Sequence, residues 1–161
     1  MMRHLLLGLA LTMAACSPQT AEAERAPATP AAPAVHPESG LEIIPLSVDL
    51  GGKRHAFRVE VARTPAQQAN GLMFRKAMGA DEGMLFPYAQ PRLLSFWMRN
   101  TVLPLDIIYI GPDGKVVNVV ANAVPYSETP LWSSAPASAV LELNAGRAAQ
   151  LGIKAGTPVS W

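Results

Sequence analysis

Hydrophobic and polar residues alternate in short runs over most of the chain after residue 40, and glycine or proline separates the runs. Residues 41–50 and 54–62 form two such runs around Gly51 and Gly52, which predicts a β-hairpin with one solvent-facing side. The same criteria predict further strands at residues 84–86, 93–98, 105–110, 115–121, 140–143 and 157–161.

Two short helices are predicted between these strands. The segment TPAQ at residues 64–67 has the form of a capping box with proline at the first helical position, and Gly71 is placed to end the helix. Asn144 is placed to cap a second helix that runs through residue 150. The pattern therefore predicts a mainly β fold, a single-domain β-sandwich or partly closed barrel with one or two short helices.

The first residues follow a different pattern. Residues 1–15 have one arginine, a short apolar run and two closing alanines, which is typical of a signal peptide. Cys16, the only cysteine, follows those alanines as in a bacterial lipobox, so we expect it to be lipidated and to be the first mature residue. The alternative is an ordinary secretory signal cut after Ala23. Both predict export.

Residues 16–40 are rich in alanine and proline, with little to bury, and are predicted to form an extended tether before the domain at residues 41–161. Ser17 follows the cysteine, and by resemblance to the envelope sorting rule this favours the outer membrane. We expect the periplasmic face of the envelope, as an outer-membrane lipoprotein or else a soluble periplasmic protein. The expected partner is the membrane, through the lipid on Cys16.

Composition excludes several kinds of chemistry. The chain has 13 Lys+Arg and 12 Asp+Glu, scattered without a basic stripe, so no nucleic-acid partner is predicted. His55 is the only histidine in the predicted domain, which excludes a closed zinc site and a Cys/His dyad there. The methionines follow no ligand spacing and are typical of core filling. We expect no metal and no cofactor.

Ionisable side chains interrupt the apolar stretch FWMRNTVLPLDIIYI at residues 96–110. Arg99 and Asp106 are costly to bury alone, so each must be paired or open to water. One interpretation pairs them across the turn at residues 100–104, whose backbone Asn100 and Thr101 would satisfy.

The other interpretation places the same residues around a pocket. An arginine, Arg75 or Arg99, would bind an anionic group, and Trp97 would form a wall. The predicted ligand-binding residues are Arg75, Trp97, Arg99, Asn100, Thr101 and Asp106.

A catalytic role is a weaker hypothesis, which needs Asp106 and Glu142 to face one cleft as general acid and base. Glu142 alternates with Leu141 and Leu143, and this predicts that it is exposed to solvent.

Five motifs together resemble the family called domain of unknown function 192 (DUF192): GLMFR at 71–75, DEGMLF at 81–86, FWMRNT at 96–101, PLDIIYI at 104–110 and VLELNAG at 140–146. The resemblance implies a small, often exported prokaryotic protein with a mainly β, sandwich-like domain. It implies no activity and no catalytic residues.

These observations predict an uncharacterised cell-envelope protein that is a non-enzymatic binding or accessory domain. The expected ligand is small and polar or anionic, such as a glycan or a peptide fragment. Two alternatives stay open: a glycan hydrolase that uses Asp106 and Glu142, and a purely structural or protein-interaction domain with unknown partners.

Overall fold

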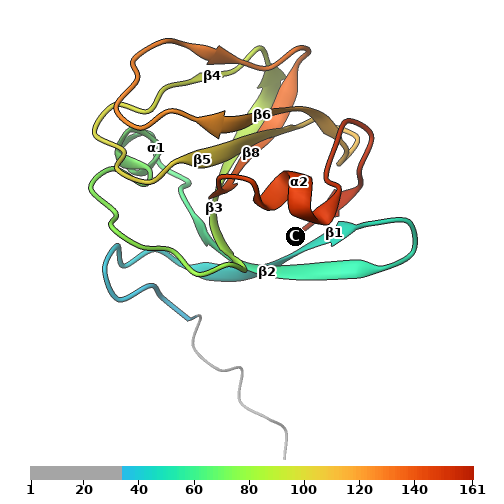
Figure 1. Cartoon of the computed structure of the whole chain (residues 1–161), viewed down its shortest axis with the longest axis horizontal. Coiled ribbons are helices and arrows are strands. Elements are labelled where there is room, and N and C mark those ends of the chain that lie inside the picture. Colours follow the sequence, from blue (N-terminus) through green and yellow to red (C-terminus); the bar gives the residue numbers. More distant parts are fainter. Residues whose placement is uncertain (1–33) are drawn as a thin grey trace, which may run out of the picture. The chain divides into compact units, whose positions relative to one another are not determined.

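The computed structural model describes residues 34–161 (Figure 1). The predicted signal peptide, Cys16 and residues 16–33 of the predicted tether lie outside the described residues. None of the described helices is long and apolar enough to cross a membrane. The elements are β1 (Ile43–Asp49), β2 (Arg54–Val61), α1 (Pro65–Asn70), β3 (Glu82–Arg92), β4 (Ser95–Phe96), β5 (Leu105–Ile110), β6 (Val116–Ala123), β7 (Leu131–Trp132), β8 (Ala137–Asn144), α2 (Arg147–Leu151) and β9 (Val159–Ser160).

Seven strands form one mixed sheet in the order β6-β5-β8-β3-β2-β1-β9, and β4 pairs with β7 in a small second sheet. All pairs are antiparallel except β2 with β3. The edge strands β6 and β9 approach each other at a single bridge between Lys115 and Pro158, so the sheet does not close into a barrel. The predicted mainly β single domain with two short helices is confirmed.

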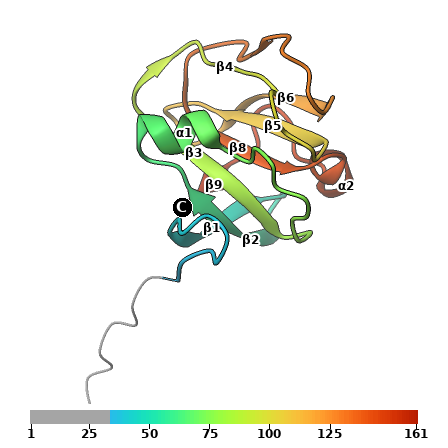
Figure 2. The same cartoon turned by 90° about the vertical axis from the view of Figure 1, so that its left-hand side faces the viewer.

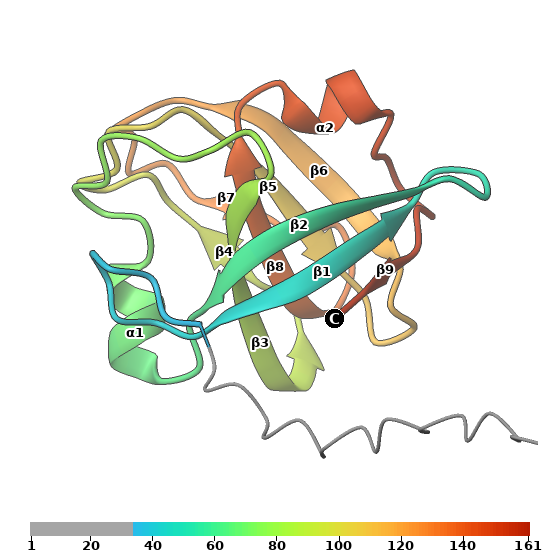
Figure 3. The ribbon, with the colours of Figure 1, turned by 90° about the horizontal axis from the view of Figure 1, so that it is seen from below.

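Two hydrophobic cores lie on the two faces of the central strands. On one face, Leu46 of β1 and Phe57 of β2 pack with Leu141 of β8, because the sheet folds back so that β1 and β2 cross over β8 (Figure 3). On the other face, Met84 of β3 and Ile107 of β5 pack in the second core. Figure 2 shows α1 and α2 on opposite sides of the sheet. Strands β5, β8 and β3 are therefore covered on both faces.

The predicted hairpin and first helix are confirmed: β1 pairs with β2, and the Thr64 hydroxyl accepts a hydrogen bond from the Gln67 backbone N–H in a full capping box. Strand β3 is much longer than the predicted residues 84–86. Its pairing with β8 is irregular between Pro87 and Arg92, where proline cannot donate to the ladder. The predicted strand at 93–98 is reduced to β4, and β7 lies in a stretch for which no strand was predicted.

Residues before the predicted domain boundary pack against the domain. Val35 forms a bridge with Glu42, and the Ser39 hydroxyl donates to the Glu60 carboxylate. Residues 34–40 are thus packed against the folded domain, although their composition predicts that they belong to the tether.

Candidate functional site

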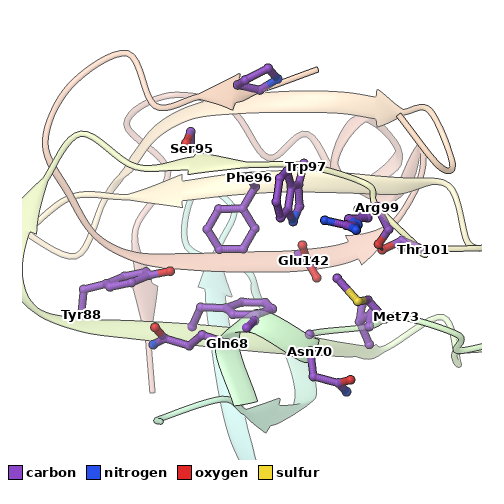
Figure 4. A pocket seen from close by; sticks show the side chains of 15 residues that line it. Gln68, Asn70, Met73, Tyr88, Ser95, Phe96, Trp97, Arg99, Thr101 and Glu142 are labelled. Carbon is purple, nitrogen blue, oxygen red and sulfur yellow. The ribbon is translucent and has the colours of Figure 1, made fainter. Parts of the chain in front are cut away.

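A pocket of about 360 Å³ opens between α1, β3, β4 and the central strand β8 (Figure 4). Its size is at the lower end of the range for small-molecule sites. The lining residues are Gln68, Ala69, Asn70, Gly71, Leu72, Met73, Phe86, Tyr88, Ser95, Phe96, Trp97, Arg99, Thr101, Pro130 and Glu142. The pocket is thus built from one helix, three strands and the loops that follow them.

Glu142 lies at the centre of this pocket. Its register partners are Met84 on β3 and Ile107 on β5, both fully buried, so its carboxyl projects from the middle of the sheet (Figure 4). The expectation of a solvent-exposed Glu142 is wrong: the residue is only 5% exposed. It alternates with leucines because β8 is a central strand, covered on both faces, and not because one face is wet.

The Glu142 carboxyl accepts no hydrogen bond and pairs with no cation within residues 34–161. Burial alone raises the pKa of Glu142 to about 8. The carboxyl oxygens are not sealed in the core, since Arg147 Nε is the one fully buried side-chain nitrogen or oxygen without a partner among the described residues. A partner for the Glu142 carboxyl would therefore have to come from the pocket. A raised pKa of this kind is also typical of functional sites.

Aromatic rings surround this carboxyl. Phe86 on β3 and Phe96 on β4 contact each other edge to face, with ring centroids 5.0 Å apart. Tyr88 and Trp97 line the same pocket, and Trp97 is 48% exposed. Trp97 therefore lies at the wall of the pocket.

Arg99 lies at the opening of the pocket. Its guanidinium carbon is 5.7 Å from the Trp97 ring centroid, and its Nε is 3.7 Å from a carboxylate oxygen of Glu128. Both charged side chains are more than half exposed. The interpretation in which Arg99 pairs with Asp106 is wrong, because Arg99 faces the pocket opening and Asp106 has other partners.

Asn100 and Thr101 shape the loop below Arg99. Thr101 is buried, lines the pocket, and donates its hydroxyl hydrogen bond to the Arg99 carbonyl at 3.2 Å. The Asn100 side chain instead reaches the sulfur of Met73, at 3.8 Å. Thr101 therefore satisfies a backbone group of its own turn, as the turn interpretation predicted, whereas the Asn100 side chain does not. Of the two, only Thr101 lines the pocket.

Backbone strain collects beside this loop. Phe74, Asn100 and Tyr126 have φ values of 62°, 55° and 63°. Such values are uncommon for asparagine and are outliers for aromatic residues. The Phe74 and Tyr126 amides donate to the consecutive carbonyls of Asn100 and Thr101, at 2.8 and 3.2 Å, so three loops are held together at the pocket edge. Strain of this kind clusters at functional sites.

Asp106 lies outside the pocket. Its carboxylate accepts hydrogen bonds from the backbone N–H groups of Asn122, Gly146 and Ala148, at 2.9, 3.1 and 2.8 Å. It thereby holds the start of α2 to the sheet. The expectation that Asn144 caps this helix is wrong, because the Asn144 side chain donates to the carbonyls of Met78 and Gly79.

Arg75 also lies outside the pocket. It forms a two-pronged ion pair with Glu60, at 2.8 and 3.0 Å, and both side chains are about 5% exposed. Its Nε is 3.2 Å from a carboxylate oxygen of Glu38. These carboxylates raise the pKa of Arg75, chiefly through the Glu60 hydrogen bonds. The Arg75 charge is thus neutralised within the fold by the ion pair with Glu60, and Arg75 is not directed toward a ligand.

His55 lies at the other side of the domain, in a small charged cluster. Its Nε2 is 2.7 Å from the Asp81 carboxylate, and Arg147 contacts both residues. These contacts, first the hydrogen bond with His55 and then that with Arg147, lower the pKa of Asp81. The cluster joins α2 to the hairpin and has no cavity beside it among the pockets of the described residues.

Among the described residues, no group of three or more His, Cys, Asp or Glu side chains is placed to hold a metal ion.

Of the predicted ligand-binding residues, the structure brings Trp97, Arg99 and Thr101 together at the pocket and places Arg75, Asn100 and Asp106 elsewhere. The sequence did not single out Phe86, Tyr88 and Phe96, and it ranked Glu142 as an exposed residue. One usable signal was present: Val140 shares the face of Glu142, so the run is apolar on both faces, as in a central strand.

Comparisons with known proteins agree with the fold. A family model named DUF192, described as "Uncharacterized ACR", matches residues 46–161. A crystal structure of a protein of unknown function from Novosphingobium aromaticivorans is 58% identical, with a TM-score of 0.78 over 82% of this chain and 94% of that one. A Sinorhizobium meliloti protein, named as a candidate transcription regulator, is 39% identical, with a TM-score of 0.73 over 74% of this chain and 94% of that one. No curated protein matches.

Proposed function

The chain belongs to the DUF192 family, and we propose that it is a non-enzymatic binding domain of the cell envelope that takes a small polar ligand, such as a glycan or a peptide fragment, into the pocket around Glu142. The observation that carries this proposal is the buried, unpartnered carboxyl at the centre of the pocket. A ligand that donates a hydrogen bond there would satisfy a group that the described protein leaves unsatisfied.

The walls of the pocket support the same proposal. More than half of the lining side chains are apolar or aromatic, and the Glu142 carboxyl and the Arg99 guanidinium point into the pocket (Figure 4). This combination is typical of pockets that bury most of a small ligand and orient it with few hydrogen bonds. The strained loops around Asn100 fix the position of Arg99 at the opening.

The geometry does not support a hydrolase that uses Asp106 and Glu142. The two side chains lie on opposite faces of the sheet, and three backbone amides already occupy the Asp106 carboxylate. Glu142 is the only carboxylate among the described lining residues, which include no histidine or cysteine. The second carboxylate that such a hydrolase needs is therefore lacking among the described lining residues, and binding is the simpler use of the pocket.

Nucleic-acid binding is not part of the proposal, although one relative is named as a candidate transcription regulator. The chain carries 13 Lys+Arg against 12 Asp+Glu, a balance without the excess of positive charge that DNA-binding domains use.

The envelope location rests on residues 1–16, which lie outside the described residues. We propose that Cys16 carries a lipid and that the domain faces the periplasm. Growth with an alkyne-labelled fatty acid should label the wild-type chain and leave the Cys16→Ser variant unlabelled. Equal labelling of both, or of neither, would contradict lipidation at Cys16.

Binding is tested with soluble glycan fragments and short peptides, titrated into the full chain in a mild detergent and followed by tryptophan fluorescence. Trp97→Ala should weaken any observed binding about tenfold, since loss of an aromatic wall costs about 1.4 kcal/mol. Trp161→Ala is the matched control, because Trp161 is equally exposed, at 48%, and does not line the pocket.

Binding that both variants retain would place the ligand elsewhere and contradict the proposed site. If none of the fragments binds the wild-type chain, the result favours a purely structural or protein-interaction domain.

A further inference from the structure

Two polar side chains of the pocket have hydrogen-bonding groups without a close partner: Glu142 at its inner end and Arg99 at its opening. Glu142 is 5% exposed and has no partner within residues 34–161. The Arg99 side chain is 53% exposed, and its contact with Glu128, at 3.7 Å, is longer than a hydrogen bond. A ligand that satisfies both would carry a donor at its inner end and an acceptor at the opening.

The rings around Glu142 favour a positively charged donor over a neutral one. Phe86, Tyr88, Phe96 and Trp97 line the pocket, and the faces of such rings attract ammonium groups. An ammonium would also pair with the ionised carboxyl, whereas a sugar hydroxyl would gain from neither charge. Aromatic rings beside one carboxylate are the known way to recognise organic ammonium ions.

At the opening of the pocket, Arg99 favours a negatively charged group of the ligand. Its guanidinium lies against the Trp97 ring and points at the pocket in Figure 4. Arginine binds carboxylates well because its donors match their two oxygens. The two ends of the pocket therefore prefer opposite charges.

Building on the proposed binding function, we propose that the ligand is a small zwitterion, with an ammonium group that pairs with Glu142 inside the pocket and an anionic group that stays at the opening against Arg99.

This arrangement has a consequence for protons. The titratable groups nearest Glu142 are Tyr88 on β3 and Tyr109 on β5, with Arg99 more distant at the opening, and its register neighbours Met84 and Ile107 are apolar. The empty pocket therefore holds Glu142 protonated near neutral pH, since burial raises its pKa to about 8. Pairing with an ammonium requires the carboxylate, so binding should release the Glu142 proton to solvent.

Two matched pairs of probes test the inner preference. Glycine betaine and 3,3-dimethylbutanoate have the same shape and differ in the ammonium centre, as do γ-aminobutyrate and pentanoate. In calorimetric titrations of the full chain at neutral pH, at least one zwitterion should bind about tenfold more tightly than its carboxylate isostere. Repeating the titration in buffers of different ionisation enthalpy should show proton release with that zwitterion.

Variants locate each end of the ligand. Glu142→Gln keeps the shape of the side chain and should lower zwitterion affinity about tenfold while abolishing proton release. Arg99→Gln should weaken the zwitterion and leave n-butylammonium, which has no anionic end, unchanged. Arg63→Gln is the matched control, because the Arg63 side chain is 55% exposed and pairs with Glu42 away from the pocket. Circular dichroism checks that each variant is folded.

Isosteres that bind as tightly as the zwitterions would overturn the inference, as would a folded Glu142→Gln variant with wild-type affinity. If glycan or neutral peptide fragments bind in a Trp97-dependent way and no zwitterion does, the zwitterion inference fails and the proposed binding function stands. If no compound of either set binds, both fail.

Discussion

Asp106 and Glu142 lie on adjacent strands and point to opposite faces of the sheet. Asp106 is paired in register with Leu143, and its neighbour Ile107 is paired with Glu142. Successive side chains of a strand alternate between faces, so the two carboxyls are separated by the sheet itself. Asp106 serves the fold, and Glu142 faces the pocket.

Replacing Asp106 should therefore lower stability. In Asp106→Asn an amide N–H2 takes the place of one of the oxygens that face the backbone N–H groups of Gly146 and Ala148. We expect a loss of about 2–4 kcal/mol in the free energy of unfolding, measured in urea. Asp113→Asn is the control, since Asp113 is exposed and accepts from Lys115 in a turn. Equal losses in the two variants would contradict the structural role of Asp106.

The Arg75–Glu60 pair should behave as a buried ion pair. Arg75→Met leaves the Glu60 carboxylate buried without its main partner, so we expect a loss of about 3–5 kcal/mol. Adding Glu60→Gln should recover part of that loss, because the second change removes the uncompensated charge. Chemical unfolding of the single and double variants measures both steps.

The exposed pair of Arg63 with Glu42, at 3.0 Å, provides the comparison. Arg63→Met should cost less than about 1 kcal/mol, as is usual for surface pairs. A similar small loss for Arg75→Met would show that Arg75 is not held in the buried pair.

Stability should fall between about pH 4.5 and 8 because of Glu142. Its pKa rises from 4.5 in the unfolded chain to about 8 in the folded protein, so the folded state binds more protons across this window. By linkage the contribution is complete below pH 4.5 and is lost as pH rises through 8, by at most about 5 kcal/mol. Urea unfolding of wild type and Glu142→Gln over this range should show the fall in wild type alone. Parallel profiles would contradict the prediction.

The strained aromatic residues at the pocket edge should lower the stability of the fold relative to glycine at the same positions. Phe74 has a φ of 62° and is 64% exposed, so Phe74→Gly removes strain and little packing. We expect a gain of about 1 kcal/mol in the free energy of unfolding. The same change at Leu93, also exposed but without a positive φ, should give no gain. A loss at Phe74 as large as that at Leu93 would argue against strain there.

The sequence correctly predicted the helices, turns and strands that depend on interactions between residues close together in the chain. The capping box at Thr64, the glycine turn between β1 and β2, and the largely apolar β5 all fold as the pattern indicates. The boundaries of β3 and β4 were wrong because pairing partners far along the chain set them: β8 extends β3 past Pro87, and β7 keeps β4 short.

The site was predicted less well, because the groups that stabilise its buried charged side chains come from residues far away in the sequence. The sequence correctly predicted that Arg99 and Asp106 are each either paired or open to water, but the interpretation that paired them with each other is wrong. The actual partners of Asp106 are backbone amides 16, 40 and 42 residues away, which no local pattern reveals. The burial of Glu142 was missed because alternation alone does not show which strand is central.

The central feature of the site is a Glu142 carboxyl that has no partner within residues 34–161 and is proposed to be free for a ligand. A ¹³C NMR titration of the glutamate carboxyls, with the Glu142 signal assigned by comparison with Glu142→Gln, measures this directly. We predict a titration midpoint near pH 8 in the ligand-free protein. A midpoint at the ordinary glutamate value, about 4.3, would mean that Glu142 is solvated or paired, and would contradict the central claim.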